Sequence, residues 1–197
     1  MGYKKREWWP GVVLHITARG HHRNDIFRDE EDFKFYLELL NEAIEFFNGE
    51  FEVYSYCLMD NHVHLLVKCK EIHISSFISR VHGMYAKIFN KKYRYLGTLY
   101  QKRYFTEIIE NDSQLLATSR YIHLNPVKAK MVNKPEEYKW SSYSMTIGIE
   151  KEKIINSEKI LEYFQSNYKR ELYKYFVESL IKNNILSEGE KDGGVSS

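Results

Sequence analysis

Strand-like and helix-like periodicities alternate along this chain, and their order limits the folds that it can adopt. Four segments are rich in β-branched and aromatic residues, as is typical of strands: residues 11–18, 51–59, 62–69 and 99–109. In three others, apolar residues recur every three or four positions, as on one face of a helix: residues 29–49, 77–89 and 113–124. Only Asp60 and Asn61 separate the second and third strand segments, which predicts an antiparallel hairpin.

The resulting order, strand, helix, strand, strand, helix, strand and helix, predicts the α+β fold class. The expected architecture is a ferredoxin-like βαββαβ sandwich, in which an antiparallel sheet carries helices on one face. The additional last helix would end near Leu124, because Pro126 disfavours helical backbone at the residue before it.

Two further helical patterns follow this core, at about residues 157–166 and 168–182. The last residues (SEGEKDGGVSS) are polar and contain two adjacent glycines, a composition typical of disordered ends. We therefore expect three parts: a domain in residues 1–145, a helical extension in 146–186 and a disordered tail in 187–197.

The basic residues are concentrated in the middle third of the chain. The whole sequence has 29 Lys and Arg against 27 Asp and Glu, a net charge of +2, but residues 70–140 hold 13 against 6. Such a cluster is suited to binding the phosphates of a nucleic acid. No apolar run approaches the roughly 20 residues that cross a bilayer, so a membrane is not an expected partner. The N-terminus has no secretory signal pattern, and the two cysteines lack paired spacing, which indicates a cytoplasmic protein.

His62 and His64 are candidate metal ligands. Side chains alternate along a strand, so both histidines share one face while Val63, Leu65 and Val67 lie on the other. Two imidazoles on an open face can chelate one divalent cation. The alternative is a pair of surface histidines without a ligand.

Tyr121 and Asn125 form a second candidate group, because positions i and i+4 share a helical face. The Asn125 amide oxygen is a hard ligand suited to Mg²⁺ or Mn²⁺. The Tyr121 phenol could act as a nucleophile toward a phosphate polarised by that cation. The alternative is a surface aromatic and a turn residue. Lys102 and Arg103 suggest a path for nucleic acid, unless they are simply solvated charges.

His15 and Thr17 match the H-x-[ST] signature of two-histidine phosphoesterases. These enzymes need a second copy of the signature, and the segment from His62 to His64 does not supply it. We therefore expect His15 to be structural or to face the substrate. A phosphoesterase that acts on small nucleotides is accordingly the hypothesis with the least support from the sequence.

Four stretches in sequence order resemble the single-tyrosine HUH (His-hydrophobic-His) transposases, the insertion-sequence-200-like family, and in particular the REP-associated tyrosine transposases. They are HITARGHHRNDIF, YCLMDNHVHLLV, RYIHLNPVKAKMV and YKWSSY, within about residues 11–145. The resemblance implies that His62, His64 and Asn125 bind Mg²⁺ or Mn²⁺ and that Tyr121 is catalytic. It also implies cleavage and rejoining of single-stranded DNA beside hairpins, through a 5′-phosphotyrosine intermediate.

Seven basic residues are the ones we expect to contact DNA: Arg19, Arg80, Lys87, Lys102, Arg103, Arg120 and Lys128. The implied partner is single-stranded DNA with hairpin structure, which would place the protein at the nucleoid. The family includes monomers and homodimers, and the sequence leaves both open, as it leaves open whether Tyr121 acts in cis or in trans. The alternative function is a domesticated protein that binds structured DNA without strand transfer.

Overall fold

The computed structural model describes residues 7–189, and its centre is a four-stranded antiparallel sheet in the order β2-β3-β1-β4. The strands are β1 (Val13–Arg19), β2 (Phe51–Met59), β3 (His62–Cys69) and β4 (Phe105–Ile108). Strands β2 and β3 form the expected hairpin. The predicted α+β, ferredoxin-like architecture is confirmed.

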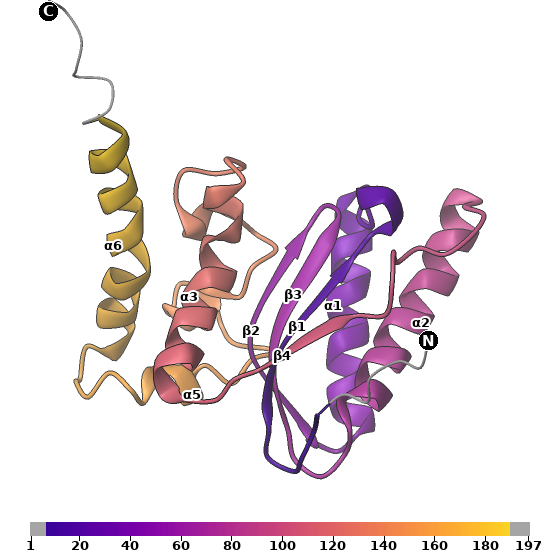
Figure 1. Cartoon of the computed structure of the whole chain (residues 1–197), viewed down its shortest axis with the longest axis horizontal. Coiled ribbons are helices and arrows are strands. Elements are labelled where there is room, and N and C mark those ends of the chain that lie inside the picture. Colours follow the sequence, from indigo (N-terminus) through magenta and orange to yellow (C-terminus); the bar gives the residue numbers. More distant parts are fainter. Residues whose placement is uncertain (1–6, 190–197) are drawn as a thin grey trace, which may run out of the picture.

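One face of the sheet is covered by α1 (Glu30–Phe46) and α2 (Ile74–Tyr93), which lie side by side to the right of the strands in Figure 1. The alternation of β3 directs Val63, Leu65 and Val67 into the core beneath these helices, as the sequence predicts. Helix α1 begins after Asp29, whose carboxylate accepts a hydrogen bond from the Asp32 amide at 3.1 Å. This first core fixes which face of β3 remains for a functional site.

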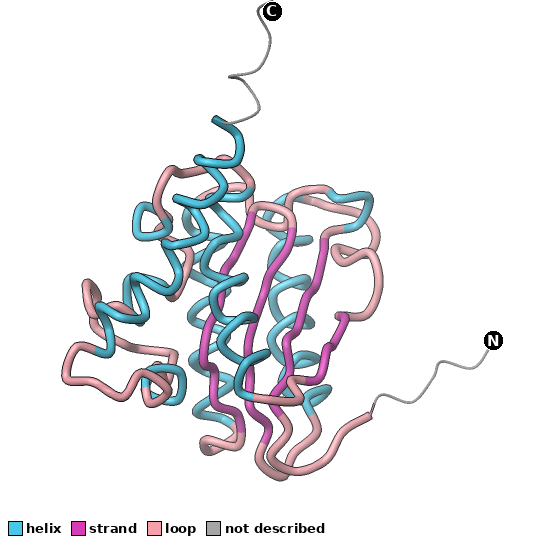
Figure 2. The backbone as a smooth tube through the Cα atoms, turned by 60° about the vertical axis from the view of Figure 1, so that its left-hand side comes forward, coloured by secondary structure: helices cyan, strands magenta, loops and turns pink. Residues whose placement is uncertain are grey.

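The opposite face is covered by α3 (Asp112–Lys128) and the C-terminal segment, so helices lie on both sides of the strands (Figure 2). That segment contains η2 (Pro135–Glu137), α4 (Tyr143–Thr146), α5 (Glu158–Leu161) and α6 (Lys169–Gly189), while η1 (His21–Arg23) follows β1. A second core joins Leu66 of β3 to Ile122 of α3 and Val177 of α6. Side chains from both sides of residue 145 therefore pack together, and the division into a domain and an extension stays a prediction.

Helix α3 differs from its predicted extent, because it continues through Pro126 to Lys128 instead of ending near Leu124. Proline cannot donate the backbone hydrogen bond of its turn. Its carbonyl, however, accepts from the Met131 amide at 2.9 Å, and Leu124 and Pro126 are both buried. Tertiary packing thus stabilises a last turn that the local sequence disfavours, and it keeps Asn125 on the helix.

Three other segments also differ from their expected bounds. The fourth strand covers four residues instead of eleven. Residues 99–104 do not form a continuous strand, and an isolated bridge pairs Tyr100 with Gly20. Of the two C-terminal patterns, the first gives only the short α5, and the second gives α6 as far as Gly189. The remainder of the expected tail, residues 190–197, lies outside the described residues. None of the helices between residues 7 and 189 has the length and apolar character of a membrane span.

A buried polar network ties α3 to its surroundings. The Tyr173 hydroxyl of α6 lies 2.6 Å from Ser119 Oγ and 2.7 Å from His123 Nδ1, both on α3. Ser119 Oγ also lies 2.9 Å from Ser55 Oγ of β2, and His123 Nε2 lies 2.9 Å from Ser142 Oγ. Because buried polar groups are costly when unpaired, this network fixes one position of α3 against the sheet.

The Tyr173→Phe substitution should lower the free energy of unfolding by about 1–3 kcal/mol, because it leaves Ser119 and His123 buried without their shared partner. Urea unfolding followed by circular dichroism measures this change. Tyr175→Phe on the same helix is the matched control, since Tyr175 is 71% exposed and should be neutral. Equal stability of the two variants would contradict the structural role assigned to this network.

Candidate active site

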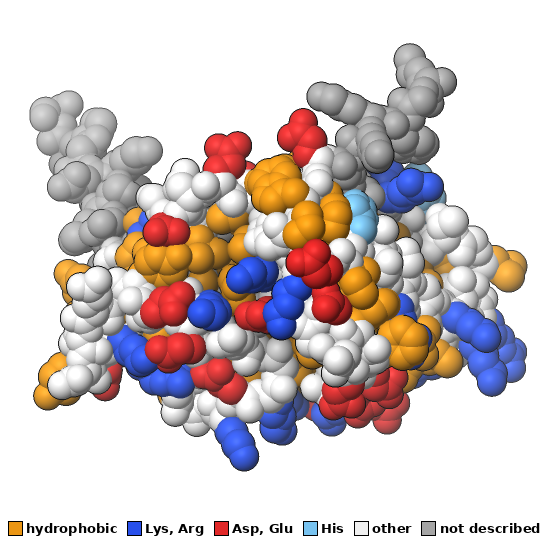
Figure 3. Space-filling model, turned by 90° about the horizontal axis from the view of Figure 1, so that it is seen from below, with side chains coloured by type: hydrophobic (Ala, Val, Ile, Leu, Met, Phe, Trp, Pro, Cys, Tyr) orange, Lys and Arg blue, Asp and Glu red, His pale blue; other side chains and the backbone are white. Residues whose placement is uncertain are grey.

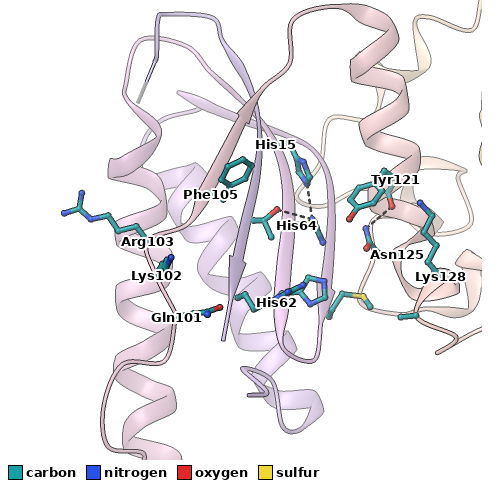
Figure 4. A pocket seen from close by; sticks show the side chains of 14 residues that line it. His15, His62, His64, Gln101, Lys102, Arg103, Phe105, Tyr121, Asn125 and Lys128 are labelled. Atoms are coloured by element: carbon teal, nitrogen blue, oxygen red, sulfur yellow. Dashed lines mark hydrogen bonds between the residues drawn. The ribbon is translucent and has the colours of Figure 1, made fainter. Parts of the chain in front are cut away.

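His62 and His64 lie on the central strand β3, on the face that α3 covers. Their ring centroids are 5.0 Å apart, and the two rings are nearly perpendicular. In the strand register His64 lies opposite Thr17, and His62 lies opposite Arg19. The structure therefore brings the two predicted ligands together at one place on the sheet (Figure 4).

Both imidazoles are held in the neutral form that binds metals. Burial, together with the neighbouring His62, His15 and Arg19, lowers the pKa of His64 to about 3. Burial, with a contribution from Arg19, lowers the pKa of His62 to about 4. The Nδ1 atom of His62 lies 2.6 Å from the Asn61 side-chain oxygen, which can only accept, so Nδ1 carries the hydrogen. The lone pair of His62 is then on Nε2, where a cation can bind it.

Tyr121 and Asn125 approach these histidines from α3. The Tyr121 ring meets the His64 ring edge-on, with centroids 5.6 Å apart, and it remains 40% exposed. The Asn125 amide nitrogen donates to the Tyr121 carbonyl at 2.9 Å, which leaves the amide oxygen for another partner. Figure 4 shows the Tyr121 side chain directed from the helix toward His64. The helical spacing read from the sequence thus produces the expected shared face.

An open cavity of about 740 Å³ joins these four residues. Its lining also includes Gln101, Phe105 and four basic side chains, which are Arg19, Lys102, Arg103 and Lys128. The Lys128 ammonium lies 4.7 Å from the centroid of the Tyr121 ring. Positive charge and an exposed aromatic ring around a cavity of this size suit a strand of nucleic acid.

The side chains at this site could bind a divalent cation, but few of them are negatively charged. Within residues 7–189 no group of three or more His, Cys, Asp and Glu side chains is placed to hold a metal ion. His62 and His64 supply two neutral nitrogens, and a third protein ligand must come from another residue type. Asn125 lines the same cavity and is a candidate for that third position, because amide oxygens are normal ligands of Mg²⁺ and Mn²⁺.

Three of the seven basic residues expected to contact DNA do not line this cavity. Arg80 and Lys87 belong to α2, across the sheet from the histidine pair, and the Arg80 guanidinium lies over the Phe46 ring at 3.8 Å. Arg120 lies over the Phe176 ring of α6 at 4.2 Å. Figure 3 shows basic and acidic side chains intermixed over the underside of the molecule, without one continuous basic surface. Charge counted along a sequence does not reveal which helix face carries it.

The residue whose place the sequence defined least was His15, expected to be structural or substrate-facing. Its Nε2 atom lies 3.0 Å from His64 Nδ1, and its Nδ1 atom lies 3.6 Å from the Glu107 carboxylate of β4. The sequence pattern also does not distinguish Phe105, which lines the cavity and is 65% exposed. In the structure His15, Thr17 and Arg19 line one cavity from the same face of β1, and the sequence carries no signal for their register against β3.

The stability of the metal-free protein should decrease as the pH falls from about 6.5 to about 4. In that range the unfolded histidines bind protons, while folded His62 and His64, with pKa values of about 4 and 3, do not. The slope is at most about 1.4 kcal/mol per pH unit for each histidine. Urea unfolding with a chelator present measures it, and His64→Gln should reduce the slope. An unchanged slope in His64→Gln would show that His64 is protonated in the folded chain.

Comparison with known proteins gives three findings. A family model described as "Transposase IS200 like" matches residues 10–125, more than half of the chain. A Haemophilus influenzae protein named "Putative REP-associated tyrosine transposase" is 28% identical over 112 residues, which cover 51% of this chain and 63% of that relative. The solved structure titled "Structure of the REP associates tyrosine transposase bound to a REP hairpin" superposes with a TM-score of 0.63 at 16% identity, over 79% of this chain and 94% of the other. This chain therefore belongs to the family of IS200-like transposases.

Proposed function

We propose that this chain is a metal-dependent endonuclease and strand transferase that acts on single-stranded DNA beside hairpins, with Tyr121 as the nucleophile. One observation carries the proposal: the Tyr121 ring lies against His64, which with His62 forms a neutral histidine pair, in a cavity bordered by four basic residues. Family membership and the hairpin named for the structural relative agree with this substrate class.

The reaction begins when the Tyr121 oxygen attacks the phosphorus of the scissile phosphodiester. The bond from phosphorus to the 3′ oxygen breaks, leaving a free 3′-OH and a 5′-phosphotyrosine. Attack of another 3′-OH on this ester restores a phosphodiester and frees the tyrosine, so the bond energy is conserved without ATP. His62, His64 and Asn125 would hold a Mg²⁺ or Mn²⁺ ion, whose positive charge supplies stabilisation for the non-bridging oxygens.

The basic residues around the cavity position the DNA backbone. Lys128 lies one helical turn beyond Asn125 and close to the Tyr121 ring, where it can contact the phosphate under attack. Lys102 and Arg103 lie on the loop before β4, across the cavity from α3. A strand held between these two sides passes directly over the histidine pair.

The same chain contributes every residue of this site, so we propose that Tyr121 acts in cis. The buried network of Tyr173, Ser119 and His123 holds α3 on its own sheet, and no exchange of helices between two copies is required. A homodimer is then compatible with activity but not necessary for it.

Incubation with single-stranded hairpins from the flanks of its own gene should give a covalent protein–DNA adduct on the 5′-phosphate side of the cut. A denaturing gel with labelled DNA measures the adduct, which should require Mg²⁺ or Mn²⁺ and disappear in Tyr121→Phe. Tyr168→Phe is the matched control, because Tyr168 is 68% exposed and outside the cavity.

Other outcomes of the same assay point elsewhere. Cleavage without an adduct would identify water as the nucleophile, and hairpin binding without cleavage would indicate a DNA-binding protein that lacks strand transfer. Mixing His64→Ala with Tyr121→Phe distinguishes cis from trans, because only exchange between copies could restore an adduct.

Replacing Lys102 and Arg103 with Gln should flatten the salt dependence of DNA binding. Each neutralised phosphate of a single strand contributes about 0.7 to the slope of log affinity against log salt, so the double variant should lose about 1.4. Fluorescence anisotropy across a salt series measures this slope. The double variant Arg80→Gln/Lys87→Gln is the control, since both residues lie on α2; an equal loss in both variants would place the DNA elsewhere.

A further inference from the structure

The Nδ1 atom of His64 is contacted by two side chains of the neighbouring strand. His15 Nε2 lies 3.0 Å away and Thr17 Oγ1 lies 3.3 Å away. On the far side, His15 Nδ1 lies 3.6 Å from an oxygen of Glu107. The strand register accounts for this row, because Thr17 is paired with His64 across β1 and β3, and His15 is paired with Glu107 across β1 and β4.

These contacts determine where the hydrogens lie. A histidine that binds a metal through Nε2 must carry its hydrogen on Nδ1, and both contacts of His64 use Nδ1. His64 can then donate to His15 only if His15 Nε2 carries no hydrogen. In a neutral ring the hydrogen of His15 is therefore on Nδ1, the atom that faces the acceptor Glu107.

We infer that His15, oriented by Glu107, is a positioning residue that holds His64 with hydrogen on Nδ1 and its Nε2 lone pair available to a divalent cation. This inference rests on the proposed function, because it assigns His64 as a ligand. Acceptors that orient ligand histidines typically contribute 10- to 100-fold to metal affinity. His15 also stacks on His64, with centroids 5.2 Å apart and planes 19° apart, which restricts rotation of the ligand ring.

His62, the other proposed ligand, also has a hydrogen-bond acceptor at Nδ1, but a different part of the chain supplies it. His62 Nδ1 lies 2.6 Å from the side-chain oxygen of Asn61, in the turn that joins β2 to β3. Each histidine of the pair thus has an acceptor at Nδ1, one from a turn and one from a strand 49 residues away in sequence. The same tautomer is imposed on both, so both Nε2 atoms are available for one ion.

Two measurements on the full chain test this inference. Long-range ¹⁵N–¹H NMR of the histidine rings, without metal, should show the His64 hydrogen on Nδ1 in the wild type and a mixture of tautomers in His15→Ala. Calorimetric titration with Mn²⁺ should show affinity 10- to 100-fold weaker in His15→Ala. His15→Gln should recover part of the loss, because its side-chain oxygen can accept from His64.

Glu107→Gln tests the outer end of the row. An amide can donate to His15 Nδ1 and so favour the opposite tautomer, which should weaken Mn²⁺ binding although Glu107 does not touch His64. Glu110→Gln is the matched control, since it removes the same charge from an exposed position near β4 and should bind Mn²⁺ as the wild type does.

A His64 hydrogen on Nε2 in the wild type would overturn the inference, and so would wild-type Mn²⁺ affinity in His15→Ala. The metal site of the proposed function is tested separately by wild type against His64→Ala. Absence of Mn²⁺ binding in the wild type would overturn that site, while the NMR result would still show whether His15 fixes the His64 tautomer.

Discussion

Burial of one face of strand β3 sets the orientation of every side chain that this strand contributes to the site. Val63, Leu65 and Val67 are fully buried against α1 and α2, and this fixes the strand's orientation. A shift of one residue would place His62 and His64 in that core and move the apolar side chains out. The hydrophobic effect therefore determines, without any direct interaction, that the two histidines face α3.

The site also requires a fixed position for α3, because Tyr121 and Asn125 can act together with His62 and His64 only if the helix holds them beside that pair. Ile122 packs in the second core, and the network through Tyr173 attaches the helix to β2 and α6. The C-terminal segment is therefore part of the framework that places the proposed nucleophile. Helix α6 contributes to that framework by packing against the helix that carries Tyr121.

The site contains neutral histidines in its interior and positively charged side chains around its edge. The histidine pair is kept neutral by burial, with lowered pKa values, while the basic residues that surround the cavity remain in contact with solvent. The Glu107 carboxylate does not line the 740 Å³ cavity, and it lies 3.6 Å from His15 Nδ1. The outer charges can thus attract a phosphate backbone while the two histidines, which are the proposed metal ligands, remain neutral.

Local sequence patterns predicted the order of strands and helices, the face shared by His62 and His64, and the face shared by Tyr121 and Asn125. These features follow from periodicities of two and of about 3.6 residues, which are local and can be read from neighbouring positions. Tertiary packing set the short β4 and the continuation of α3 through Pro126, and it left Arg80, Lys87 and Arg120 outside the cavity lining. It also decided the contact between His15 and His64, because that contact depends on the register of two strands and on packing between distant segments, which no local pattern encodes.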